Sequence, residues 1–247
     1  MKKDCAEIAL AYLDEIRMKG LPFASKQLHQ HLENTKNQHK PHTITARLHL
    51  IGKELGQLIE NKTDKFNLLK QMWRYETVQE RLLAINALSY LAEKYPGQVK
   101  EFLLDLADDI QNWKISLQMA MRLIAQMVIN NPTELFIILN RWVESNDPLK
   151  RQMAMSCIPA YIRSPKGEIN SALRFISKGM EEHDTKTSQT VAWALREISK
   201  KNPEKTTEFL KHWAQTDNSY TKKIIENALK FLPEKEQKEI LRLLSNE

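Results

Sequence analysis

Trp193 has polar and basic neighbours in the sequence, and their spacing from it would place all of them on one face of an α-helix. Lys186 and Gln189 precede it by seven and four residues, and Lys200 follows it by seven. Such intervals place side chains on the same face of a helix. An aromatic surface among cations is what packing against nucleic acid requires. The alternative is that Trp193 packs against a neighbouring helix or loop.

The environment of Trp193 follows from an internal repeat with a period of about 36 residues. Three segments share one pattern: YPGQVKEFLLDLADD from Tyr95, NPTELFIILNRWVESND from Asn131 and NPEKTTEFLKHWAQTDN from Asn202. The prolines of the first two are 36 residues apart, and the third follows after 71 residues, or nearly two periods. Asn before Pro suits a helix start, because Asn caps and Pro fits the first helical position. The missing copy falls near Gly167, where another helix is predicted to begin.

The helix before each proline repeats as well, at twelve, nine, eight and five residues upstream. The residues at these positions are Ala84, Ala87, Leu88 and Leu91, then Ala120, Leu123, Ile124 and Met127, and finally Val191, Ala194, Leu195 and Ile198. Four such positions form one stripe, which we expect to be buried. The chain is therefore predicted to be all-α, an α-α superhelix (solenoid) of about six to seven HEAT-like helix pairs and about 14 helices.

This repeat organisation predicts one domain over residues 1–247, without an internal boundary. Residues 1–70 hold divergent N-terminal helices, residues 71–232 the regular repeats and residues 233–247 a polar C-terminal cap. The segment Thr35–Thr43, with the sequence TKNQHKPHT, is predicted to be a flexible loop.

The register also defines a position ten residues before the proline, roughly opposite the buried stripe. Asn86, Arg122 and Cys157 occupy this position in the earlier copies, and Trp193 occupies it in the last. We expect these side chains to face outward or into a groove. Trp113 differs, because it lies at the start of its helix near the core side, where packing is the default expectation.

The formal net charge of +6 lies in the C-terminal third of the sequence. Between Pro148 and Lys230 there are 15 Lys and Arg against 9 Asp and Glu, whereas the remaining residues hold 22 of each sign. Concentrated positive charge is the usual electrostatic footprint of a polyanion site. The alternative is a lysine-rich, solvated face.

Composition excludes several classes of protein. No apolar stretch approaches the roughly 20 residues needed to span a bilayer. Acidic residues interrupt the apolar run near the N-terminus, which a secretory signal would not tolerate. Two cysteines imply no disulfide framework, so we predict a cytoplasmic protein. No glycine-rich phosphate loop or paired-cysteine motif is present, and we expect no cofactor. We also expect a monomer.

Histidine and cysteine offer little chemistry. Five of the seven histidines cluster near the N-terminus: His29, His31, His39, His42 and His49. Zinc needs converging ligands at suitable spacing, and His29 and His31 cannot share a helix face, so we expect solvated histidines and no metal. Cys157 lies between apolar residues without an obvious histidine partner, which argues against a nucleophile.

Three runs of sequence resemble the bacterial alkylpurine DNA glycosylase D (AlkD) family. They are VAWALREISKKNPE (Val191–Glu204), RWVESNDPLKRQMAM (Arg141–Met155) and YETVQERLLAINALSYLAEKY (Tyr75–Tyr95). The similarity covers roughly residues 70 to 230, and the Trp-x-x-Arg-Glu run beside Asn-Pro is its more specific part. The resemblance implies a HEAT-like solenoid that cradles duplex DNA in a basic concave groove. It further implies excision of cationic N3- and N7-alkylated purines, without a metal and without flipping the base into a pocket.

The resemblance also implies an active centre of two tryptophans and an aspartate beside the deoxyribose of the lesion. Trp193 and Trp113 match the tryptophans, but Leu117 stands where the family has the aspartate. A carboxylate there would stabilise the positive charge that develops on the sugar as the glycosidic bond breaks. Leu117 lies on the apolar side of its helix, where we expect a core residue.

Two further positions depart from the family pattern. Lys114 stands where an acid usually follows the tryptophan, and of a pair of arginines only Arg151 remains, followed by Gln152. Asp108 and Asp109 are near Trp113 but precede it, so we assign them to a helix junction.

We therefore predict a DNA-binding protein of the alkylation repair type, whose partner is duplex DNA, alkylated or not, and whose excision activity is reduced or lost. The candidate DNA-binding residues are Trp113, Trp193, Arg122, Arg151, Lys186, Gln189 and Lys200, with no catalytic residue assigned. Two alternatives stay open. One is a HEAT-repeat scaffold whose groove binds a protein, and the other is an active glycosylase that uses a different acid.

Overall fold

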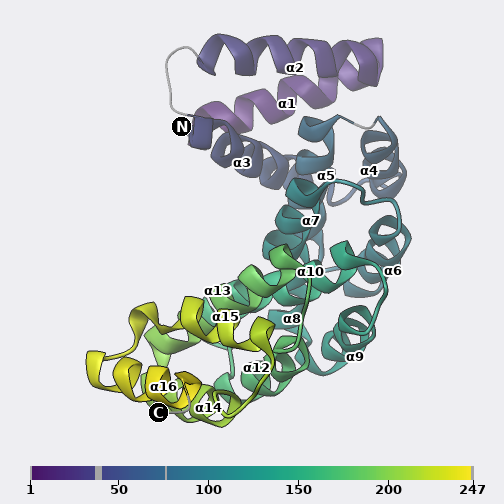
Figure 1. Cartoon of the computed structure of the whole chain (residues 1–247). Helices are drawn as coiled ribbons and strands as arrows, with labels where there is room; N and C mark the ends of the chain where they lie inside the picture. Colours follow the sequence, from purple (N-terminus) through teal and green to yellow (C-terminus); the bar gives the residue numbers. More distant parts are fainter. Residues whose placement is uncertain (1, 37–40, 76, 246–247) are drawn as a thin grey trace. The chain divides into compact units, whose positions relative to one another are not determined.

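The computed structural model describes residues 2–36, 41–75 and 77–245 (Figure 1). Within these ranges the regular secondary structure is entirely helical. The prediction of an all-α protein built from helix pairs is confirmed. The chain divides into two compact units, the N-terminal unit Met1–Asp109 and the C-terminal unit Ile110–Glu247.

The N-terminal unit contains three helix pairs. Its helices are α1 (Lys2–Lys19), α2 (Leu21–Lys36), α3 (Pro41–Ile59), α4 (Lys65–Arg74), α5 (Val78–Leu91) and α6 (Pro96–Ala107). Helix α3 packs against both α1 and α5, and these three helices form one layer (Figure 1). The backbones of α3 and α5 approach closely, because a Cβ added at Gly52 would lie 2.8 Å from the carbonyl oxygen of Leu83. The predicted loop Thr35–Thr43 is wrong at both ends, because α2 extends to Lys36 and α3 begins at Pro41, and its residues 37–40 fall outside the described residues.

The C-terminal unit contains four helix pairs. Its elements are α7 (Trp113–Gln118), the π-helical segment η1 (Met119–Ile124), α8 (Ala125–Asn130), α9 (Pro132–Val143), α10 (Pro148–Ser156), α11 (Ile158–Arg163), α12 (Ile169–Ile176), η2 (Ser177–Gly179), α13 (Thr185–Lys201), α14 (Pro203–Trp213), α15 (Ser219–Ala228), η3 (Leu229–Phe231) and α16 (Glu234–Ser245). Helix α10 packs against α7 and α13, and α13 also packs against α15, so these helices form one layer of the unit. Helices α9, α12, α14 and α16 form the second layer (Figure 1).

The predicted helix starts are present. Pro132 and Pro203 begin α9 and α14, and the preceding Asn131 and Asn202 accept hydrogen bonds from the backbone N–H groups three residues on. Pro96 likewise begins α6, and the copy expected near Gly167 is α12. The Asn-Pro pair therefore acts as sequence analysis indicates, by satisfying N–H groups that a helix start leaves unpaired.

The predicted buried stripe is also confirmed, because all twelve apolar residues assigned to it are buried. The expectation for the opposite position is wrong at Asn86 and Cys157, which are only 4% and 0% exposed. Asn86 faces α3, and its side chain donates to the carbonyl of Leu82 and contacts His49. Cys157 lies at the break between α10 and α11, so the register of one continuous helix does not extend to it.

Candidate nucleic-acid interface

Helix α13 carries four of the predicted binding residues, Lys186, Gln189, Trp193 and Lys200. Asp184 determines where this helix begins. Asp184 Oδ1 accepts hydrogen bonds from the backbone N–H and the hydroxyl of Thr187, at 2.8 and 2.9 Å. Burial disfavours the charged carboxylate, but these hydrogen bonds and the charge of Arg151 outweigh it and lower the pKa of Asp184. The ionised carboxylate at the N-terminus therefore stabilises this helix.

Seven residues of the C-terminal unit line one surface depression of about 290 Å³, here called the tryptophan depression. They are Trp113, Leu117, Gln152, Lys186, Gln189, Thr190 and Trp193, contributed by α7, α10 and α13. Four of the seven predicted binding residues thus converge on one site. Among these lining residues only Lys186 carries a charge.

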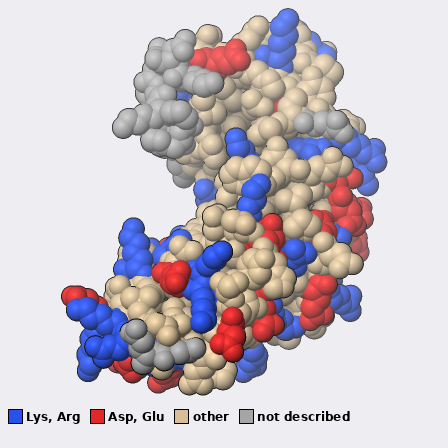
Figure 2. All heavy atoms as spheres, viewed as in Figure 1, with Lys and Arg blue, Asp and Glu red and all other residues tan. Residues whose placement is uncertain are grey.

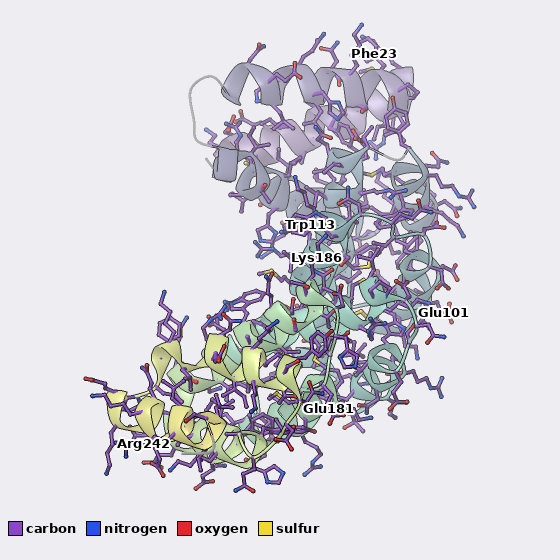
Figure 3. All side chains as sticks on the ribbon, in the orientation of Figure 1. Phe23, Glu101, Trp113, Glu181, Lys186 and Arg242 are labelled. Atoms are coloured by element: carbon purple, nitrogen blue, oxygen red, sulfur yellow. The ribbon has the colours of Figure 1, made fainter. Side chains whose placement is uncertain are left out.

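Trp113 is the first residue of α7 and is 43% exposed. The default expectation that it packs into the core is therefore wrong. The side chain of Asn112 caps this helix by accepting from the N–H of Lys114, and the first turn has no preceding turn to cover it. The ammonium of Lys186 lies 5.3 Å from the centroid of the Trp113 ring, and Figure 3 shows the two residues side by side. Lys114 lies 5.9 Å from the same centroid.

Leu117 is half-buried and lines the tryptophan depression, so the expectation of a core residue is wrong here too. The buried side of this helix runs through Ile115, Ser116 and Met119. Leu117 lies about 100° on from Ser116 around the helix axis and therefore outside the arc that these three residues span. A residue at this position faces the depression, as the family resemblance requires of the aspartate.

Trp193 is half-buried and reaches the same depression, whereas its neighbours Ala192 and Ala194 are fully buried. The guanidinium of Arg163 lies 5.9 Å from the centroid of the Trp193 ring. Arg163 also lies 3.5 Å from a carboxylate oxygen of Glu197. Arg163 was not among the predicted site residues, because only the packing of α11 against α13 brings it to Trp193.

Polar side chains hold the parts of the depression together. The hydroxyl of Ser116 donates to Oε1 of Gln152 at 3.2 Å, and Gln152 is only 5% exposed. The hydroxyl of Thr190 donates to the carbonyl of Lys186 within α13. Gln152 was predicted only as a departure from the family pattern, and neither it nor Thr190 was predicted to line a site.

Arg151 does not line the tryptophan depression. Its guanidinium pairs with the carboxylate of Glu182 at 2.7 and 3.3 Å, and donates to the carbonyls of Ser145 and Asn146 at 2.9 and 3.1 Å. Glu182 in turn accepts from the N–H of Asp184. Arg151 therefore ties the start of α10 to the start of α13, and its contact with DNA stays a prediction.

Arg122 and Lys200 also lie outside the lining. Arg122 belongs to the π-helical segment η1, where burial and the charge of Arg163 lower the pKa of its guanidinium. Lys200 pairs with Glu197 at 2.7 Å and lies 4.4 Å from the centroid of the Phe231 ring. Their roles in DNA binding stay predictions.

Three of the N-terminal histidines contact other side chains, although solvated histidines were expected. His49 lies 2.5 Å from the amide oxygen of buried Asn86, so the interpretation as solvated is wrong for it. His29 contacts the fully buried Glu80 at 3.2 Å, and His31 contacts Arg47 at 3.3 Å. The side chains of His39 and His42 fall outside the described residues.

Both cysteines, Cys5 and Cys157, are free thiols and are buried. Burial raises the pKa of each thiol, which keeps it protonated and unreactive. Asp108 and Asp109 follow the end of α6, at the helix junction that sequence analysis assigned to them.

Basic side chains are frequent on the surface over α13 and α15 (Figure 2). Helix α13 contains Lys186, Arg196, Lys200 and Lys201 against one acid, Glu197. The local excess of positive charge indicated by the sequence therefore includes the helix that lines the tryptophan depression.

The stacked pairs of helices define a HEAT-like helical-repeat protein. A family model described as DNA alkylation repair enzyme matches residues 30–232, which is most of the sequence. This chain belongs to that family. No curated protein matches the sequence. None of the helices in the described ranges has an apolar run long enough to cross a membrane.

Two solved structures from Streptococcus mutans share the fold. The crystal structure of smu.31 from strain UA159 has a TM-score of 0.61 and 21% sequence identity, covering 77% of this chain and 98% of that one. The X-ray structure of AlkD2 has a TM-score of 0.61 and 20% identity, covering 83% and 98%. At this identity the likeness concerns the fold alone.

Proposed function

We propose that this protein binds duplex DNA at the tryptophan depression and that its excision of alkylated purines is reduced or lost. The observation that carries the proposal is the composition of the depression. It brings the two tryptophans that match the family to one site together with Lys186, and it has Leu117 where the family has an aspartate.

The binding part of the proposal is supported by charge and aromatic surface. Trp113 offers an exposed ring, and Lys186 and the other basic residues of α13 offer cations for phosphates. Lys and Arg contacts to phosphates supply most of the sequence-independent affinity for DNA. Aromatic rings between such cations add packing surface for sugars and bases.

The proposed loss of excision is supported by the lining of the depression, which has Leu117 at the family's aspartate position and contains no carboxylate. Breaking the glycosidic bond builds positive charge on the sugar, and a fixed carboxylate would stabilise it. Removing one well-placed electrostatic group costs about 2.7–4 kcal/mol of transition-state stabilisation, or roughly 10²- to 10³-fold in rate. Lys186 would add repulsion to that loss.

Binding is tested by measuring affinity for an undamaged duplex between 50 and 200 mM salt. Phosphate contacts release counterions, so log Kd should rise linearly with log salt. Lys186→Met should lower the slope by about one. Affinity that is independent of salt, or absence of duplex binding, would favour the alternative of a scaffold for a protein partner.

Excision is tested by measuring release of 7-methylguanine from duplex DNA. We expect release close to the rate without protein. Rapid release that disappears in Trp193→Ala would contradict the proposed loss and favour the alternative of an active glycosylase with a different acid.

A further inference from the structure

The two tryptophans of the depression lie beside cations from the protein itself. Lys186 and Lys114 lie 5.3 and 5.9 Å from the centroid of the Trp113 ring, and the Arg163 guanidinium lies 5.9 Å from that of Trp193. These distances are within the range at which a cation is attracted to the face of an aromatic ring. The electron-rich ring surface that could attract a cationic ligand is therefore already in contact with positive charge.

Carboxylates do not compensate this charge at the depression. Arg163 has Glu197 as a partner at 3.5 Å, but no carboxylate among the described residues pairs with Lys186. The remaining lining side chains are the uncharged Leu117, Gln152, Gln189 and Thr190. The net charge of the lining is thus positive.

An N3- or N7-alkylated purine carries a positive charge. To bind it, a site must offer negative charge or an uncovered aromatic face, because two like charges a few ångströms apart repel. The lining of the tryptophan depression contains no carboxylate, and each of its two aromatic rings already lies beside a cation of the protein. Its amide groups and its ammonium instead suit a phosphodiester and a neutral sugar or base, since these present hydrogen-bond acceptors.

We propose that Lys186 determines the ligand class of the tryptophan depression, which accepts the phosphodiester backbone of DNA with neutral bases and discriminates against cationic alkylpurines. This inference rests on the proposed binding of duplex DNA. It goes beyond the loss of excision, because it concerns which DNA is bound before any chemistry. Excision would then be disfavoured twice, by the leucine at position 117 and by the lysine at position 186.

The test compares three duplexes that differ at one guanine. The first is unmodified, the second carries neutral 7-methyl-7-deazaguanine, and the third carries cationic 7-methylguanine on a 2′-fluoro sugar, which resists loss of the base. We expect the wild-type protein to bind the cationic duplex no more tightly than the neutral isostere. Lys186→Met should shift the ratio of the two affinities towards the cationic duplex by about threefold to tenfold.

Lys205→Met is the matched control, because it removes one positive charge from an exposed lysine of the same unit. Lys205 lies in the first turn of α14, and its ammonium donates a hydrogen bond to the side-chain oxygen of Asn170. It does not line the tryptophan depression. It should lower affinity for all three duplexes and leave the ratio unchanged. Equal thermal midpoints of the variants would show that both fold.

Two outcomes would overturn the inference while leaving the proposed function intact. One is a wild-type preference for the cationic duplex of more than about threefold, and the other is an unchanged ratio in Lys186→Met. Absence of binding to all three duplexes would instead overturn the proposed function, and the inference with it.

Discussion

The ammonium of Lys186 and the indole ring of Trp113 lie 5.3 Å apart and join α13 to the first turn of α7. This contact spans 73 residues of sequence and covers part of an exposed ring with a cation. It makes the tryptophan depression an aromatic site with a positive edge, which differs electrostatically from an aromatic site with a carboxylate.

Trp113→Ala should weaken duplex binding with little effect on folding. The ring is 43% exposed in the free protein, so its removal opens a small cavity at most and should change the stability little. An aromatic side chain that becomes buried when a partner binds contributes about 1–2 kcal/mol or more to the binding free energy. Affinity and thermal midpoint are measured together. Tyr220→Ala is the control, since Tyr220 is equally exposed on α15 but does not line the depression. Equal losses of affinity in the two variants would place DNA elsewhere.

Leu117→Asp should restore measurable release of 7-methylguanine. The new carboxylate would face the depression and stabilise positive charge on the sugar, with a gain of about tenfold over the wild-type protein. Lys186 lies in the same lining and would attract that carboxylate, so the gain should be larger when Lys186→Met is added. No release by either folded variant would mean that the depression differs from the active family members in more than these two side chains.

Asp184→Ala should destabilise the C-terminal unit by about 0.5–2 kcal/mol, because the N-cap of α13 loses its acceptor. Since folding lowers the pKa of this carboxyl, its stabilising contribution is present above the pKa of the unfolded chain, about 3.9, and is lost as pH falls through the lower folded pKa. Urea unfolding at pH 7 and at pH 3 checks both statements. The difference between wild type and variant should shrink at the lower pH, and a constant difference would contradict the assigned role.

Arg151→Ala should lower stability more than it lowers the salt dependence of DNA binding. Its guanidinium makes four contacts at or below 3.3 Å with Glu182, Ser145 and Asn146, and the loss leaves the partly buried Glu182 without its cation. Breaking such a pair costs about 1–3 kcal/mol. Urea unfolding and the slope of log Kd against log salt separate the two roles. An unchanged stability with a slope reduced by about one would assign Arg151 to phosphate binding instead.

The local features of the fold were predictable because they depend on neighbours along the chain. Asn131 and Asn202 cap the helices that Pro132 and Pro203 begin, and the period of 36 residues placed twelve buried residues correctly. Helical periodicity and capping are properties of a few consecutive residues, so sequence alone determines them. The positions of Trp193, Lys186 and Gln189 on one side of α13 follow from the same periodicity.

Tertiary structure decided which of these side chains meet, and what charge surrounds them. Cys157 is buried because α10 and α11 break at that residue, and Leu117 faces the depression because Ile115, Ser116 and Met119 define the buried side of its helix. The contact of Lys186 with Trp113 depends on the packing of α10 between α7 and α13. Such contacts depend on how helices that are distant in sequence stack against one another. A single helix break or π-helical segment also changes which side chains face the core, so the periodicity of the sequence no longer predicts their direction. The sequence by itself therefore determined the repeat and the residue types of the candidate site, and only the stacking of the helices brought these residues together and made the site positively charged.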